Sequence, residues 1–345
     1  MIWLTWRQLR VQASAVLGLL AVLDVVLAVT GPGIADDYAR GIAACHGDAC
    51  DIFARRFADD HRALFIGTGV AVLFVPAIVG LFWGAPLITR ELEAGTHRLV
   101  WNQTVTRTRW LAVKLAVTGA AAIVAALVAS LAVTWWAHPL DAASARQVPR
   151  LTPIVFDARG IVPLGHAAFA FVLGVAVGTL VRRTLPAMAV TLAVFAAVQV
   201  AVPMLVRPHL IAPVTTTTAI TARNMESLMM DGDKGAVHVR VKAPEDGSWT
   251  LANDTLDARG RVVSSLAMDL DSGPCAPPPP GDAAIDGGPS QACFDAMAAL
   301  GYRQRVVYQP ADRFWPLQWM ETGMYAVLAL VLSGLCFWTV RRRVT

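Results

Sequence analysis

The chain has 345 residues, of which 56% are hydrophobic and only 16% are charged, and its mean hydropathy is +0.53. An ordinary soluble domain carries about 25% charged residues, so this composition argues against one and favours lipid as the solvent. The formal net charge is +4. Because the arginines stand at the edges of apolar segments and form no single basic stripe, the charge indicates membrane topology and argues against nucleic-acid binding.

Apolar segments of about 20 residues recur along the chain with almost no charge inside them, and each could cross roughly 30 Å of hydrocarbon as a helix. The six segments are residues 11–29, 63–87, 111–136, 161–181, 185–206 and 317–340. The first follows a short basic stretch and resembles a signal peptide. No small-residue cleavage site follows it, so we expect this segment to be retained as the first span.

Arginines in the short connections predict the orientation. Arg182 and Arg183 lie in a tight turn, and three more arginines at 341–343 follow the last span. Such residues favour the cytosolic side, and counting back through the spans places residues 90–110 and both termini on that side too. We therefore expect a multi-pass protein of the plasma (inner) membrane with cytosolic N and C termini.

Two longer connections fall outside in this topology, and each holds a pair of cysteines. The pairs are Cys45 with Cys50 and Cys275 with Cys293. Both pairs are local and lie on the oxidising side of the membrane, which favours two disulfides over free thiols. A zinc site that uses His46 and His61 with the first pair is an alternative, but the spacing matches no standard zinc site.

Residues 207–316 form a segment of the size of a small domain. Alternating residues at 237–241 predict a strand, 247–265 reads as strand, turn and strand, and 293–300 predicts a short helix. The expected fold class is an all-α polytopic membrane protein with six transmembrane helices. A small mixed α/β extracytoplasmic domain is expected between helices 5 and 6, which divides the chain into 1–206, 207–316 and 317–345.

The sequence lacks the motifs of the commoner catalytic sites. No G-x-x-x-x-G-K-[ST] phosphate-binding loop occurs, so the chain should not bind and hydrolyse ATP by itself. G-x-S-x-G and H-E-x-x-H are also absent. We expect no enzyme activity and no cofactor in this chain, and any ATP-driven work requires a partner.

The connection after the second span, "RELEAGTHRLVWNQTVTRTRWLAVK" at residues 90–114, resembles the type-2 permease family of ABC exporters. In that family an acidic helix leads into Gly-Thr, an apolar turn and a small-residue break before Arg, and a Lys opens the next span. The corresponding residues here are Glu91, Glu93, Gly95, Thr96, Leu99, Val105, Thr106, Arg107 and Lys114. Thr104 departs from the pattern, since the family commonly has Pro there. Residues 302–330 are similar to the last-span entry of actinobacterial permeases of this family.

The resemblance implies that the loop at 90–110 docks on a cytosolic ATP-binding cassette subunit, which carries ATP and Mg and drives closure of the spans. The implied coupling residues are Glu91, Glu93, Gly95, Thr96, Arg98, Leu99 and Arg107. Charged residues among them can pair across a wet interface, and Leu99 can act as an apolar anchor. Without the resemblance, a solvated polar loop with a basic topology signal explains the residues equally well.

Few polar groups interrupt the spans, and because buried charge in lipid is costly, they are candidates for a substrate path. They are Asp24, Gln199 and Glu321, although interface hydration and helix packing explain them as well. The expected function is export of a hydrophobic or amphipathic substrate by a permease dimer through alternating access, with membrane lipid as a further partner. A membrane-anchored sensor or envelope assembly factor with a ligand-binding outer domain is the alternative.

Overall fold

The structure is a computed structural model that describes residues 2–95, 106–145, 148–231, 236–266, 273–276 and 289–342. The chain divides into two compact units. The helix unit comprises Met1–Leu210 with Phe314–Thr345, and the strand unit comprises Ile211–Arg313. The strand unit lies within the predicted extracytoplasmic segment 207–316.

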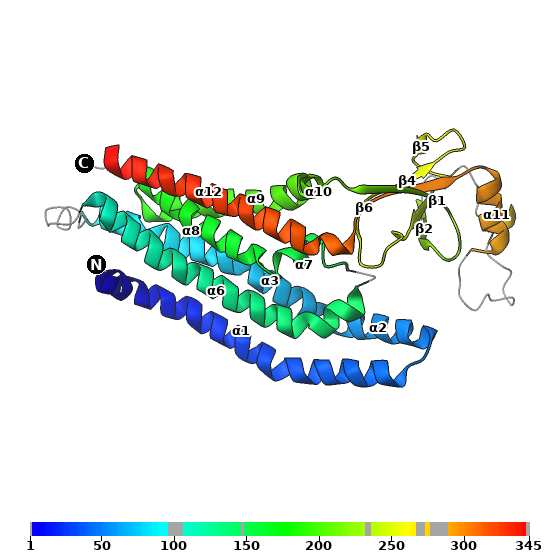
Figure 1. Cartoon of the computed structure of the whole chain (residues 1–345), viewed down its shortest axis with the longest axis horizontal. Coiled ribbons are helices and arrows are strands. Elements are labelled where there is room, and N and C mark those ends of the chain that lie inside the picture. Colours follow the sequence, from blue (N-terminus) through cyan, green and yellow to red (C-terminus); the bar gives the residue numbers. More distant parts are fainter. Residues whose placement is uncertain are drawn as a thin grey trace. The chain divides into compact units, whose positions relative to one another are not determined.

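The helix unit is built mainly from long helices (Figure 1), and six helical stretches among the described residues are strongly apolar. In chain order it contains α1 Ile2–Ala44, α2 Asp48–Asp60, α3 Arg62–Val79, the π-helical turn η1 Gly80–Gly84, α4 Pro86–Glu93, α6 Arg107–Ser144, α7 Pro153–Asp157, α8 Val162–Val181, α9 Thr184–Ala201, the π-helical turn η2 Val202–Val206, α10 Arg207–Leu210 and α12 Phe314–Arg342. Helix α3 continues through η1 into α4, and α9 continues through η2 into α10. Each of these sets forms one continuous helical stretch.

Six helical stretches among the described residues are long and apolar enough to cross a membrane, in agreement with the predicted number. They are Val16–Ala44, Arg62–Glu93, Arg107–Ser144, Val162–Val181, Thr184–Leu210 and Ala311–Arg342. Large aliphatic side chains project from them, and Val29, Leu185 and Leu330 are each at least 71% exposed. Lipid is the solvent in which such side chains are stable, because it replaces the missing protein contacts.

The first predicted loop is helical. The sequence predicts a connection between the first two spans, residues 11–29 and 63–87, but α1 continues past Pro32 to Ala44, and α2 folds back against it. Tyr38 of α1 packs against the rings of Phe53 and Phe57 of α2, and a disulfide between Cys45 and Cys50 closes the hairpin. The apolar run ends at residue 29, but aromatic packing between the two helices stabilises the extension.

Helix α8 is the centre of the helix unit. In its most apolar stretch 78% of the residues are buried, whereas the buried share in the other spans is at most 50%. It packs on η1 at backbone contact. A Cβ atom at Gly84 would lie 2.4 Å from the carbonyl oxygen of Phe171, and one at Gly174 would lie 2.4 Å from the carbonyl oxygen of Gly80. Only glycine permits this approach, as in other close helix pairs of membrane proteins.

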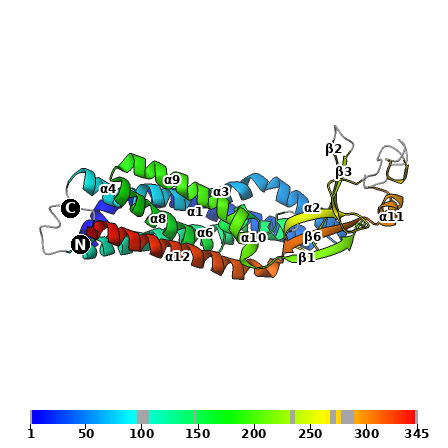
Figure 2. The same cartoon turned by 90° about the horizontal axis from the view of Figure 1, so that it is seen from above.

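The helix unit has two polar ends. Helix α1 begins and α12 ends at one of them, together with the end of α4 and the start of α6 (Figures 1 and 2); we call it the Glu93 end. The opposite end holds α7, the start of α8 and the start of α12, which the Gln318 side chain joins; we call it the Asp157 end. Because the number of crossings is even, the start of the first helix and the end of the last helix lie at the same end of the unit.

The strand unit is an antiparallel α/β arrangement. A four-stranded sheet has the order β1-β6-β4-β5 and a two-stranded sheet pairs β2 with β3. The elements are β1 Val214–Ala219, β2 Met225–Asp231, β3 Ala236–Val241, β4 Trp249–Leu256, β5 Val262–Val263, α11 Gln291–Ala299 and β6 Arg303–Gln309. The strands expected at 237–241 and within 247–265, and the helix expected at 293–300, correspond to β3, β4 with β5, and α11.

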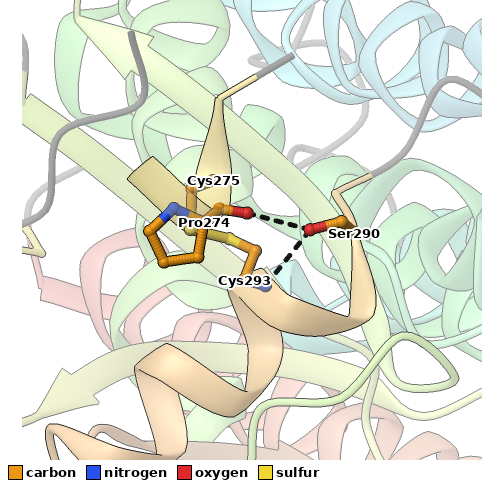
Figure 3. The surroundings of a disulfide bond; sticks show 4 residues. All are labelled: Pro274, Cys275, Ser290 and Cys293. Carbon is orange, nitrogen blue, oxygen red and sulfur yellow. Dashed lines mark hydrogen bonds between the residues drawn. A yellow bond between two sulfur atoms is a disulfide. The ribbon is translucent and has the colours of Figure 1, made fainter. Parts of the chain in front are cut away.

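A disulfide between Cys275 and Cys293 joins the start of α11 to the preceding segment (Figure 3). Ser290 caps the helix: its hydroxyl accepts a hydrogen bond from the Cys293 amide at 3.3 Å and donates one to the Pro274 carbonyl at 2.9 Å. Cys293 is fully buried beside Phe294 and Met297. Serine is among the preferred residues at such a helix start because its oxygen satisfies an amide that has no partner inside the helix.

Candidate functional site

An ionic cluster is buried at the Asp157 end of the helix unit. Arg207 of α10 donates two hydrogen bonds to the carboxylate of Glu321 in α12, at 2.7 and 2.9 Å, and its Nη2 atom also bonds to the carboxylate of Asp157 in α7. The three side chains are at most 6% exposed. A guanidinium that binds one carboxylate through two parallel hydrogen bonds is a strong and directional pair, because both partners are charged and planar.

Further polar groups surround this cluster within the helix unit. His166 of α8 has its Nε2 atom 3.9 Å from Glu321, and its Nδ1 atom lies 3.2 Å from the Gln199 amide of α9. Tyr325 donates a hydrogen bond to Gln199 at 3.2 Å. Helices α7, α8, α9, α10 and α12 therefore meet in one connected polar network.

Gln318 fixes the connection before α8 to the start of α12. Its Oε1 atom accepts hydrogen bonds from the backbone amides of Ile161 and Val162, both at 2.9 Å, and its Nε2 atom donates to the Phe156 carbonyl at 3.0 Å. The side chain is fully buried. Both acceptor sites of its oxygen and one N–H of its amide are thus paired with backbone groups at this connection.

The charges of the cluster are unequal. Two carboxylates share one guanidinium, and burial raises the pKa of the Asp157 carboxyl to about 6, although the positive charge of Arg207 opposes this shift. Oxygen and nitrogen atoms of Asp157, His166 and Glu321 come within 4.8 Å of one another, which is close enough to ligate a cation. Arg207 already binds both carboxylates, so a guanidinium supplies positive charge at this position.

Two of the predicted path residues belong to this network. His166 joins Gln199 to Glu321, and Tyr325 donates a further hydrogen bond to Gln199. Asp24 does not take part: it lies in α1, and its Oδ1 atom is buried without a hydrogen bond among the described residues.

The sequence alone does not indicate a role for Arg207 or Asp157. Arg207 follows the fifth apolar run and so has the appearance of an ordinary boundary arginine, and Asp157 stands between two spans. A pairing across 50 residues leaves no local signal in the sequence.

The Glu93 end carries a different set of contacts, made by the last turn of α4. Glu91 forms an ion pair with Lys114 of α6 at 2.5 Å, and Lys114 also donates to the Leu87 carbonyl at 3.3 Å. Lys114 is 4% exposed and lies 4.8 Å from the Trp110 ring. Helix α4 is in this way tied to the start of the third span.

Glu93 ties the same helix to the fifth span. Its two carboxylate oxygens accept hydrogen bonds from the backbone amide of Thr184 at 2.8 Å and from the Thr184 hydroxyl at 2.7 Å. Thr89 lies 2.8 Å from the same hydroxyl. Thr184 is the first residue of α9, so a carboxylate occupies the positive end of that helix, where its charge is favourable.

Gly95 ends α4 with a φ of +68°, the left-handed conformation that commonly terminates helices and that glycine adopts at the least cost. Thr96, Arg98 and Leu99, which the sequence assigned to coupling, lie outside the described residues. Arg107 opens α6 after Thr106, whose hydroxyl accepts a hydrogen bond from the Arg109 amide at 3.3 Å. The described coupling residues therefore flank residues 96–105 on both sides.

Comparison with known families gives a match for most of the helix unit. The sequence profile of the ABC-2 membrane transporter related family matches residues 17–207, which is more than half of the chain. The chain belongs to this family. The ABC-2 match confirms the resemblance to type-2 permeases that the 90–114 segment indicated, and with six apolar helices it makes this a multi-pass membrane protein of a permease family.

The ABC-2 match ends at Arg207 and so leaves out the strand unit and α12. No curated protein and no solved structure matches the chain significantly.

Proposed function

We propose that the chain is the membrane-spanning permease subunit of an ABC-type exporter. It works as a dimer, with a second copy or a sister permease, and a separate cytosolic subunit binds ATP and Mg. Membership of the ABC-2 family supports this division of labour, as does the lack of a phosphate-binding motif in the sequence. The cargo is hydrophobic or amphipathic and moves outward.

The observation that carries the proposal is the double attachment of α4. Glu91 contacts Lys114 in α6, and Glu93 contacts Thr184 in α9. One short helix is thereby bonded to the third and the fifth spans. Because residues 96–105 follow α4 directly in the sequence, a force on that segment reaches α4 first and both spans next.

The proposed orientation places the Glu93 end in the cytosol. Arg182 and Arg183 connect α8 to α9 at this end, and Arg341 of α12 donates a hydrogen bond to Thr108 of α6 at 3.4 Å. Arginines close to the ends of spans favour the cytosolic side. The ATP-binding subunit would then contact the connection between α4 and α6 on the cytosolic side of the membrane.

Alternating access follows from the two ends together. Approach of the ATP-binding subunits pushes on α4 and shifts α6 and α9. Helix α9 continues through η2 into α10, which carries Arg207. A shift of α9 therefore pulls on the Arg207 contacts with Asp157 and Glu321, and their separation opens the Asp157 end to the outside.

The test is co-expression of the full chain with the ATP-binding subunit encoded beside it, followed by purification into lipid nanodiscs. We expect the two subunits to purify together, and we expect the permease to stimulate ATP hydrolysis by its partner. Glu93→Ala removes both acceptors of Thr184 and should lower this stimulation severalfold while the complex still forms.

Asp37→Ala is the matched control, because Asp37 is an exposed carboxylate of α1 that pairs only locally with Arg40. It should leave the stimulated ATPase rate unchanged. The proposal fails if no complex forms, or if the Glu93 and Asp37 variants have the same rate as the wild type.

A further inference from the structure

A cavity of about 560 Å³ lies in the helix unit between α2, α3, α6 and the residues around α7. Its walls are mostly apolar and include Phe65, Ile66, Leu140 and Val155. Arg159, on the connection between α7 and α8, also lines it. A volume of this size is typical of pockets that hold one drug-sized ligand, with apolar walls and a few polar groups for orientation.

Arg159 has unused hydrogen-bonding capacity. The residue is only 3% exposed, yet its Nε and Nη1 atoms have no hydrogen bond among the described residues. Its guanidinium lies 5.5 Å from the Phe65 ring, which lines the same cavity. Buried polar nitrogens without partners are uncommon in folded proteins and call for an explanation such as a ligand.

The nearby carboxylate does not satisfy this arginine. Asp141 Oδ2 is 3.6 Å from Arg159 Nε and 3.7 Å from Arg150 Nε, distances that are too long for good hydrogen bonds. One carboxylate is thus placed between two guanidinium groups, and one positive charge is left over. At the rim of the cavity, exposed Arg62 and Asp59 offset each other.

We propose that this cavity binds an amphipathic anion, whose carboxylate or phosphate head bonds to Arg159 and whose single apolar chain lies along Phe65, Ile66 and Val155. A purely apolar ligand leaves the Arg159 nitrogens unpaired, which is costly in a buried site. A small inorganic anion leaves the apolar walls empty. Only a ligand with both parts complements the cavity, since a charged head and a buried guanidinium form a strong hydrogen-bonded pair.

The inference deepens the proposed function and rests on it in one respect: it makes this cavity a subsite for the exported cargo. Such an anion has two sources, a membrane lipid or the cargo itself. Binding can be measured on the chain alone, whereas transport needs the ATP-binding subunit, so the two proposals fail separately.

The binding test uses the full chain in nanodiscs of zwitterionic lipid and a fluorescent dodecanoate, with fluorescence anisotropy as the readout. Dodecyl phosphate should compete with the probe, whereas dodecyltrimethylammonium and inorganic phosphate should not. Arg159→Met should raise the Kd at least about tenfold, since a hydrogen bond to a charged group is lost. Arg40→Met, at an exposed arginine of α1, is the control and should leave the Kd unchanged.

A second variant keeps the proposal testable if Arg159→Met fails to fold. Ile66→Trp places a larger side chain in the cavity from an exposed position of α3 (41% exposed) and leaves Arg159 and Asp141 in place. It should also weaken binding of the probe. Equal binding of the cationic and anionic amphiphiles, full competition by inorganic phosphate, or unchanged binding in both variants would overturn the proposal.

The source is decided by turnover. With the ATP-binding subunit present, addition of ATP and Mg should release the preloaded probe, and without ATP the probe should stay bound. Retention of the probe throughout turnover identifies the occupant as a resident lipid and overturns the assignment of this cavity to cargo.

Discussion

The two polar ends of the helix unit use charge in opposite ways. At the Glu93 end, Glu93 is an exposed carboxylate that bonds to the first residue of α9. At the Asp157 end, Arg207, Asp157 and Glu321 are withdrawn almost completely from solvent. Water can replace the exposed Glu93 contact at little cost, whereas a broken contact in the Asp157 cluster, as in the buried Glu91–Lys114 pair, leaves a buried charge without a partner.

This difference assigns different tasks to the two ends in the proposed transport cycle. The Glu93–Thr184 contact is exposed and exchanges readily with water, which suits a region that moves whenever the ATP-binding subunit moves, while the buried Glu91–Lys114 pair keeps α4 on α6. A buried cluster suits a closure that stays shut until several helices separate at once. Helix α8 lies between the two regions and is packed at backbone distance on η1, so in the proposed cycle we expect it to transmit displacement from one end to the other.

The largest expected effect is at Arg207. Arg207→Met leaves Asp157 and Glu321 buried without their cation, and removing one partner of a buried ion pair typically costs about 3–5 kcal/mol. We expect a large fall in the thermal unfolding temperature of the protein in nanodiscs.

The triple variant Arg207→Met, Asp157→Asn, Glu321→Gln is the matched control, because it removes all three charges together. It should regain most of the lost stability. If the single variant unfolds at the wild-type temperature, the cluster does not hold the Asp157 end closed.

The next effect is a dependence of stability on pH. The pKa of Asp157 is raised from 3.8 to about 6 in the folded chain, so the folded state binds this proton more tightly than the unfolded state. The contribution to stability is fully present below about pH 4 and is lost as the pH rises through 6. At about 1.4 kcal/mol per pH unit, the loss over this window is about 3 kcal/mol.

Asp157→Asn removes the titrating group, and the test is the unfolding temperature of both proteins between pH 4 and 7. The variant should gain stability relative to the wild type as the pH rises. Asp37→Asn, at an exposed carboxylate, should follow the wild type at every pH. A constant difference between the Asp157 variant and the wild type contradicts the assigned pKa direction.

How far the sequence predicts this structure depends on the range of the interaction. Apolar runs predict spans because lipid imposes the same length and composition on every crossing. The pattern at 90–114 likewise contains both Glu91 and Lys114. Their contact spans only 23 positions, so both partners lie in one recognisable motif. The partner of Glu93 is Thr184, which lies 91 positions away, and a single sequence holds no record of that contact.

The same limit explains what was missed at the Asp157 end. Glu321 stands out in the sequence because a carboxylate inside a span is unusual. Its partner Arg207 stands where boundary arginines are common, so residue type and position carried no signal. Hydropathy gives no signal for the hairpin of α1 and α2 for a related reason. Aromatic packing of Tyr38 on Phe53 and Phe57 stabilises a helix that continues through Pro32 and the polar pair Asp36 and Asp37.

The smallest of these effects on stability is expected at the Glu93 end, from Lys114→Met. The substitution removes the ammonium that pairs with Glu91 and keeps the apolar stem beside Trp110. Removing one partner of a fully buried ion pair typically costs about 3–5 kcal/mol. The Glu91 side chain keeps 11% exposure and only one carboxylate loses its partner, so we expect about 2 kcal/mol, the cost of one hydrogen bond to a charged group. The double variant Glu91→Gln, Lys114→Met should recover part of this loss, as measured by thermal unfolding in nanodiscs. If Lys114→Met destabilises the protein as much as Arg207→Met does, the two ends are equally rigid, and the division between a moving end and a closing end is wrong.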